Sequence, residues 1–175
     1  MRAVATILDR ISAGLNRLAI WGAGAAVVVM TFSALYQVVA RYIFSSPPIW
    51  TEELARYAMV WAGLLGASVA FRAAADPVLF PGGRSVPGGL GIALTLLRAA
   101  GVAIFVAPIL YYSFFGPLSG YLARTFSRDA EMLGVSMIWF AVAIPIAFSL
   151  ILLHLLADLA TRFANGGKAA ETQRD

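Results

Sequence analysis

Long apolar stretches without charged side chains dominate the pattern of this chain. Four segments lack Asp, Glu, Lys and Arg, and they cover residues 18–40, 57–71, 99–123 and 132–157. A helix needs about 20 residues to cross the hydrocarbon core of a bilayer. The runs are far longer than membrane β-strands and do not alternate between polar and apolar residues. Each segment is therefore a candidate transmembrane helix.

The second apolar segment is short for a span unless its helix begins in the polar turn before it. Thr51 suits the N-cap of a helix, and Glu52 and Glu53 follow where acids interact favourably with the helix dipole. A helix over 52–72 is then long enough to span. We expect one all-α membrane domain over 1–175, with four transmembrane helices and a cytoplasmic tail. The expected spans are 18–44, 52–72, 94–118 and 132–157, and the tail is 159–175.

The first 17 residues have a different, amphipathic pattern. Apolar residues recur three or four positions apart, while Asp9, Arg10, Asn16 and Arg17 fall on the other side. This pattern is typical of a helix lying in the membrane interface, so we expect an amphipathic interfacial helix over 1–17. An N-terminal extension of the first span explains it equally well.

Composition supports a membrane protein and excludes several functions. Hydrophobic residues make up 61% of the chain and charged residues 13%, and the mean hydropathy is +0.82. The basic residues are scattered between apolar blocks, which is not the pattern of nucleic-acid binding. Because the chain has no cysteine and one histidine, it can hold neither a disulfide nor a bis-histidine haem within itself. We expect no metal and no cofactor.

The distribution of basic residues predicts the orientation in the membrane. Nine basic residues lie in the N-terminal segment, the middle loop and the tail, against four in the other two loops. Since cytoplasmic loops are enriched in Lys and Arg, both termini are expected in the cytoplasm. The middle loop, 73–89, is rich in proline and glycine, so we expect it to be irregular and mobile.

Few polar groups are expected at membrane depth. None of the nine acids falls deep inside a predicted span, since Glu52 and Glu53 stand at the very start of 52–72, although proton relays and ion-coupled transporters usually use intramembrane acids. Arg98 lies near the start of the third span, where its side chain can snorkel to the interface. His154 precedes Asp158 by one helical turn, so the carboxylate could orient the ring. One histidine and one acid are too few for a metal site, and the common catalytic motifs are absent, so an enzyme is the weakest class.

Small residues form a stripe on the predicted second helix. Stripes of this kind let another helix backbone approach closely, either within the unit or from a partner. The stripe consists of Ala62, Gly63, Gly66 and Ala70, and a shorter version is formed by Gly22 and Ala26 on the first helix.

The most specific pattern surrounds the first external loop. The order is Arg-Tyr, two prolines, Trp, Thr-Glu-Glu and Arg-Tyr, and its distinctive residues are Arg41, Tyr42, Trp50, Glu52, Glu53 and Arg56. Arg41, Tyr42 and Trp50 suit the membrane–water interface, and Glu52 lies four residues before Arg56, where they can pair. We expect the two acids to hold Arg56 and groups of a partner, beyond capping a helix.

This order resembles the small, DctQ-like membrane subunit of tripartite ATP-independent periplasmic (TRAP) transporters. The resemblance implies a scaffold in the bacterial inner membrane that braces a large membrane subunit and helps to dock a periplasmic solute-binding protein. It also implies sodium-driven uptake of organic acids by the complex. The third loop would then supply docking residues, and the candidates are Arg124, Arg128, Asp129 and Glu131.

Two other functions are compatible with the chain. A self-contained homo-oligomeric transporter or channel would use Arg98 and His154 as functional residues. A membrane anchor for a redox enzyme would need further haem ligands from other chains.

Overall fold

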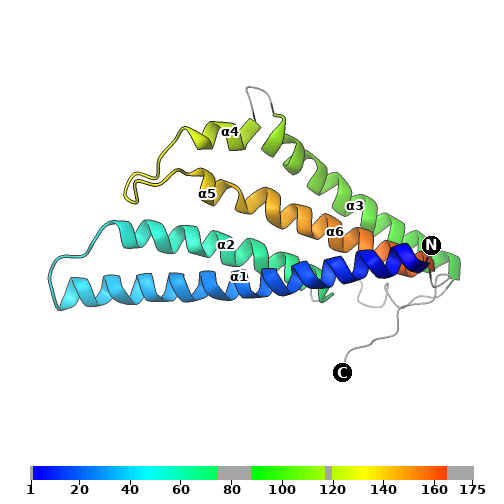
Figure 1. The fold of residues 1–175 in the computed structure, drawn as a ribbon, viewed down its shortest axis with the longest axis horizontal. Helices are drawn as coiled ribbons and strands as arrows, with labels where there is room; N and C mark the ends of the chain where they lie inside the picture. The colour runs from blue at the N-terminus through cyan, green and yellow to red at the C-terminus, as the bar shows by residue number, and fades with distance from the viewer. Residues whose placement is uncertain (1, 75–87, 117–119, 165–175) are drawn as a thin grey trace.

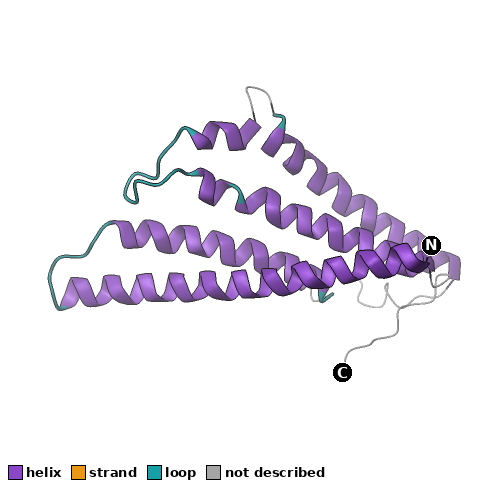
Figure 2. Ribbon diagram, in the orientation of Figure 1, coloured by secondary structure: helices purple, strands orange, loops and turns teal. Residues whose placement is uncertain are grey.

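The computed structural model describes residues 2–74, 88–116 and 120–164. These residues form helices joined by turns, and four helices are long and apolar enough to cross a membrane. The expected all-α membrane fold with four spans is therefore confirmed (Figures 1 and 2). The helices are α1 Arg2–Tyr42, α2 Trp50–Arg72, α3 Gly88–Phe114, α4 Gly120–Phe126, α5 Ile138–Ala141 and α6 Ala143–Ala164.

The long helices converge at one end and spread at the other (Figure 1). At the converging end α1 begins and α6 ends, and we call it the terminus end. At the opposite end lie the turn 43–49 and the turn 127–137, and we call it the loop end. Helices α1 and α2 form an antiparallel hairpin, and α6 packs against both. Helix α3 packs against α6 and diverges from it toward the loop end, where α4 lies.

Helix α6 is the centre of the assembly because it contacts α1, α2 and α3. Its most buried residues include Ala143, Ala147 and Ala157, which are 0%, 1% and 2% exposed. Lipid tails are as apolar as leucine, so helices in a membrane are held by close packing, which small residues permit. The alanine face of α6 lets its neighbours approach.

Helices α1 and α2 pack tightly at Gly22. A Cβ atom at Gly22 would lie 2.9 Å from Leu65 Cδ1, closer than real contacts allow. Leu65 is buried, so the missing side chain of Gly22 makes room for it. Of the short stripe expected on the first helix, Gly22 therefore faces α2.

Helix α1 is continuous over 41 residues, with no break near residue 17. At a rise of about 1.5 Å per residue it is about 60 Å long, twice the thickness of the hydrocarbon core. Residues 2–17 therefore continue the helix of the first span without a break, and their place in the membrane interface stays a prediction.

The third and fourth spans differ from the expected 94–118 and 132–157. Helix α3 begins at Gly88 and ends at Phe114, and the short α4, which the sequence did not suggest, follows it. Residues 132–137 belong to a turn, so the last span begins at Ile138 and runs to Ala164. Because this turn carries no charged residue after Glu131, hydropathy alone assigns it to the transmembrane helix. Most of the middle loop, 75–87, and the tail after 164 lie outside the described residues.

The close approach at Gly22 gives a first prediction. Gly22→Leu should lower the free energy of unfolding by about 1–3 kcal/mol, because the new side chain overpacks the space that Leu65 fills. Gly24→Leu is the matched control, since a Cβ at Gly24 meets no atom within 4 Å. Unfolding in mixed detergent micelles measures both variants. Equal stability of the two would contradict close packing of α1 on α2.

Candidate functional site: a polar loop end and a polar terminus end

The first part of the motif ends α1 and starts α2 at the loop end. Trp50 stacks on Tyr36, with ring centroids 6.1 Å apart. Tyr42 is 80% exposed and Arg41 is exposed as well, so both are available to lipid headgroups or a partner. The contact between Trp50 and Tyr36 therefore anchors the loop to α1, while Arg41 and Tyr42 remain exposed.

Thr51 is not the N-cap that its position suggests. Helix α2 already includes Trp50, and its N-cap is Ile49, which makes no side-chain cap bond. Thr51 is fully buried and donates its hydroxyl to the carbonyl of Pro48 over 2.7 Å. The hydroxyl bonds back to the turn because the helix starts two residues earlier than predicted.

Glu53 joins α2 to the turn 127–137. Its Oε2 accepts the backbone N–H of Met132 over 2.8 Å and that of Leu133 over 2.9 Å. Its Oε1 accepts the hydroxyl of Tyr57 over 3.2 Å. Hydrogen bonds to an ionised acceptor are about twice as strong as neutral ones. Glu53 thus holds a distant segment of its own chain.

The turn that Glu53 holds is a compact structure. Asp129 and Ser136 pair as an antiparallel bridge, and the N–H of Met137 donates to the carbonyl of Arg128 over 2.8 Å. Gly134 has a φ of +63°, a left-handed conformation that favours glycine, and its N–H bonds to Ala130. Backbone hydrogen bonds within the turn and the two that Glu53 accepts together give it its shape.

Aromatic residues fasten α2 to the start of the last span. The rings of Tyr57 and Phe140 are stacked, with centroids 3.7 Å apart and planes 10° from parallel. The indole N–H of Trp61 donates to the carbonyl of Trp139 over 3.1 Å. Together with Glu53, these contacts fix the loop end between α2 and α5.

Glu52 makes a different contact from Glu53. It pairs with Arg56 over 2.9 Å, and both side chains are 63% exposed. The expected pair within the motif is present, but an exposed pair contributes little stability. The structure therefore separates the two acids: Glu53 orders the chain itself, and Glu52 with Arg56 remains accessible.

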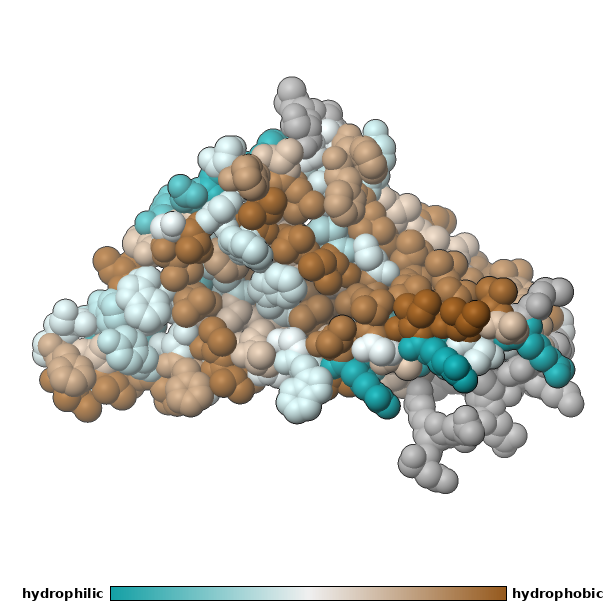
Figure 3. Space-filling model, viewed as in Figure 1, coloured by the Kyte–Doolittle hydropathy of each residue, from teal (hydrophilic) through white to brown (hydrophobic). Residues whose placement is uncertain are grey.

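The four expected docking residues lie on or after α4 and are all exposed at the loop end. Arg124 belongs to α4, and the others belong to the turn 127–137. Figure 3 shows hydrophilic residues on this part of the surface, at the upper left of the view. These residues are Arg124, Arg128, Asp129 and Glu131.

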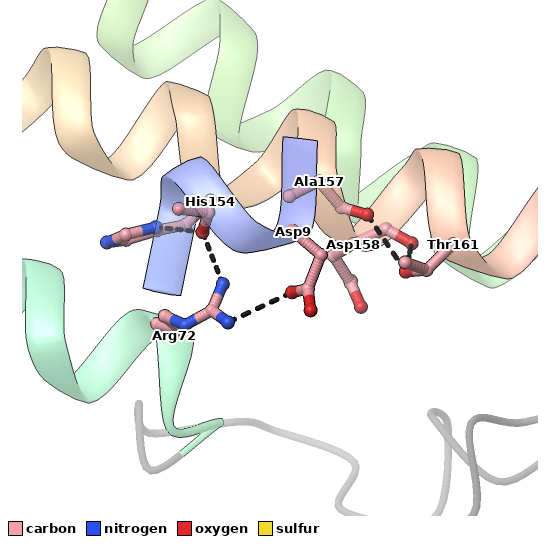
Figure 4. A network of polar contacts seen from close by, with 7 residues as sticks. Asp9, Arg72, His154, Ala157, Asp158 and Thr161 are labelled. Carbon is pink, nitrogen blue, oxygen red and sulfur yellow. Dashed lines mark hydrogen bonds and ion pairs between the residues drawn. The ribbon is translucent and has the colours of Figure 1, made fainter. Parts of the chain in front are cut away.

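A polar cluster at the terminus end joins three helices (Figure 4). Arg72 of α2 donates to Asp9 of α1 over 2.9 Å and also to the hydroxyl of Ser12. Ser12 Oγ lies 2.7 Å from His154 Nδ1 of α6. A guanidinium can only donate, so Ser12 accepts from Arg72, and the tautomer of the His154 ring decides which way the bond between Ser12 and Nδ1 runs. Ser12 and His154 are both buried.

Asp158 does not orient His154 as the sequence suggests. Its carboxylate instead pairs with Arg98 of α3 over 3.4 Å, and the ring of His154 turns to Ser12. The Arg98 guanidinium also lies over the ring of Phe71, 4.7 Å from its centroid. Arg98 thus connects α3 to α2 and α6. Among the described residues, no group of three or more His, Cys, Asp or Glu side chains is placed to hold a metal ion.

The small-residue stripe of α2 leaves open space beside it. A Cβ atom at Gly63 or Gly66 would meet no atom within 4 Å outside its own helix. Gly63 is exposed, while Ala62, Gly66 and Ala70 are partly exposed. The close approach inside the unit is made at Gly22, so the glycines of the α2 stripe are accessible to another helix.

Comparison with known proteins identifies the family. Residues 30–165 match the family described as tripartite ATP-independent periplasmic transporters, DctQ component. The chain belongs to this family. It is also 40% identical over 58 residues to the sialic acid TRAP transporter permease protein SiaT of Haemophilus influenzae (strain 86-028NP). That match covers 33% of the chain and 9% of SiaT, so the chain corresponds to a small part of this relative. The chain is thus a multi-pass membrane component of a TRAP transporter.

The division between the two glutamates gives a second prediction. Glu53→Ala should lower the free energy of unfolding by about 1.5–3 kcal/mol, because hydrogen bonds to a charged group contribute on that scale. Glu52→Ala is the matched control and should cost less than about 1 kcal/mol. Hydrogen exchange at the Met132 and Leu133 amides should accelerate in Glu53→Ala alone. Similar exchange in both variants would show that Glu53 does not hold the turn.

Proposed function

We propose that this chain is the small scaffold subunit of a TRAP transporter in the bacterial inner membrane. It braces a large membrane subunit and helps to dock a periplasmic solute-binding protein during sodium-driven uptake of an organic acid. The observation that carries the proposal is the position of the carboxylates. Those of the described residues gather at the two ends of the bundle, and the apolar middle contains none.

The position of the acids argues against transport by this chain alone. Asp9 and Asp158 lie at the terminus end and pair with arginines there. Glu52, Glu53, Asp129 and Glu131 lie at the loop end. A coupling-ion or proton pathway normally needs an ionisable group within the membrane, facing a cavity. A partner subunit would supply that group.

The surface of the spans supports a bracing role. In α1, α2 and α3, 11–17% of the residues of each apolar window are buried inside the structure. Figure 3 shows the broad apolar surface that results. The open glycines Gly63 and Gly66 on α2 would let a helix of the large subunit approach closely. Fixed turns at the loop end would keep this surface in one orientation.

The loop end suits docking of a soluble partner. Its exposed charges include both signs, and charged groups at an interface rim guide orientation and association rate. Arg128, Asp129 and Glu131 lie in the turn that Glu53 holds, so their positions are fixed relative to α2. With both termini in the cytoplasm, this end faces the periplasm.

The proposed orientation gives a third prediction. In right-side-out membrane vesicles, a cysteine at Ser46 or Ser127 should react with a membrane-impermeant maleimide added outside, because both residues are exposed at the loop end. A reporter fused after Asp175 should be active in the cytoplasm. The chain has no native cysteine, so the unmodified protein is the background control. Labelling of Ser46→Cys only from the cytoplasmic side would reverse the orientation.

The scaffold role gives a fourth prediction. In proteoliposomes the chain alone should catalyse no uptake, while the complex with its large subunit and binding protein should take up solute in a sodium gradient. Gly66→Leu should lower co-purification of the large subunit about tenfold or more, because it blocks close helix approach. Gly14→Leu is the control, an open glycine on the extension of α1. Sodium-driven uptake by the chain alone would refute the scaffold role.

A charge-reversing substitution in the same assay distinguishes docking of the binding protein from bracing of the large subunit. Arg128→Glu should raise the concentration of binding protein needed for half-maximal uptake about fivefold and leave the yield of the complex unchanged. Arg17→Glu, at the far end of the bundle, should change neither. An unchanged requirement for binding protein in Arg128→Glu would remove this turn from the docking surface.

A further inference from the structure

An open apolar groove runs between α2, α3 and α6. Its volume is about 300 Å³, and its lining is almost wholly apolar. Val106, 1% exposed, is the buried residue of its lining. Gly101 lies on α3 beside it, and a Cβ there would meet no atom within 4 Å. The lining residues are Phe71, Gly101, Val102, Phe105, Val106, Phe148 and Ile151.

One end of the groove carries a guanidinium. Arg98 lies one helical turn before Gly101 and Val102 on α3, toward the terminus end. Its guanidinium lies over Phe71, which itself lines the groove. The Arg98 side chain is 24% exposed while it pairs with Asp158, so its charge is accessible from outside. The groove therefore has an apolar length and a cationic end.

The terminus end of the bundle as a whole carries an excess of positive charge. Among the described residues, six arginines and two aspartates lie at the terminus end. The arginines are Arg2, Arg10, Arg17, Arg72, Arg98 and Arg162, and the aspartates are Asp9 and Asp158. Each Arg near a membrane surface adds attraction for anionic lipid. A purely apolar partner helix would gain nothing from this charge.

We propose that the groove binds one anionic phospholipid of the leaflet on the side of the termini. An acyl chain lies along Val102 and Phe105, and the phosphate lies at the guanidinium of Arg98. From Arg98 to Phe105 the groove extends about 10 Å along α3, at about 1.5 Å per residue. Each acyl methylene that is buried there adds to the affinity. The site does not depend on the proposed transport role.

Native mass spectrometry of the full chain in detergent tests the site. Dioleoylphosphatidylglycerol should be retained as a single adduct, with an apparent affinity about fivefold higher than that of dioleoylphosphatidylcholine. Arg98→Gln should remove this preference. Gly101→Leu should lower retention of both lipids about tenfold, because the new side chain displaces acyl methylenes worth about fourfold each.

Matched variants separate the groove from general lipid adhesion. Gly63→Leu adds the same side chain at another open glycine, outside the groove, and should retain phosphatidylglycerol as the wild type does. Arg124→Gln removes an exposed arginine at the loop end and should keep the preference for the anionic lipid. Free glycerol phosphate should not compete, since it lacks the chain that fills the groove.

Three outcomes would overturn the proposal. The first is wild-type retention in Gly101→Leu, which would place the lipid elsewhere. The second is equal retention of the two lipids by the wild type, which would remove the role of Arg98. The third is loss of the large subunit from Gly101→Leu with lipid retention unchanged, which would make the groove a protein interface.

Discussion

The packing of small residues on α6 is the constraint on which the rest of the structure depends. In a bilayer, apolar side chains gain little by leaving lipid for protein, so helix association depends on how closely backbones approach. Ala143, Ala147 and Ala157 are buried and allow α1, α2 and α3 to gather around one helix. The other long helices need little contact with one another beyond the α1–α2 hairpin. Much of their outer surface therefore remains uncovered.

Specific polar contacts then fix the positions of the helices and turns relative to one another, which apolar packing alone does not determine. At the loop end Glu53 binds two backbone N–H groups of a turn, and at the terminus end Arg72 joins Asp9 to Ser12. Both sets lie at the ends of the bundle. Polar groups cost less free energy there than in the apolar middle. An apolar body with polar ties at its two ends suits a subunit whose proposed task is to hold other proteins in place.

Hydropathy was sufficient to predict the four spans, but it could not predict where two of them begin. Residues 132–137 carry no charge and were expected in a helix, yet they form a turn that Glu53 and bonds within the turn hold. The motif around Glu52 and Glu53 was found in the sequence because its residues are adjacent. The partners of Glu53 could not be found in this way, because Met132 and Leu133 lie 79 and 80 positions away. For His154 the nearest acid along the helix was the natural choice, and the actual neighbour, Ser12, comes from the opposite end of the chain.

The contact between Ser12 and His154 has a consequence for biogenesis. The two residues are 142 positions apart, so their contact cannot form until the last span has entered the membrane. Until then Ser12 and Asp9 lie near the start of a finished helix without the histidine that closes the cluster. Arg72 of α2 is already made at that stage and can bind Asp9, so a truncated chain lacks only the buried partner that α6 brings to Ser12. Closing the polar cluster at the terminus end therefore waits for synthesis of α6.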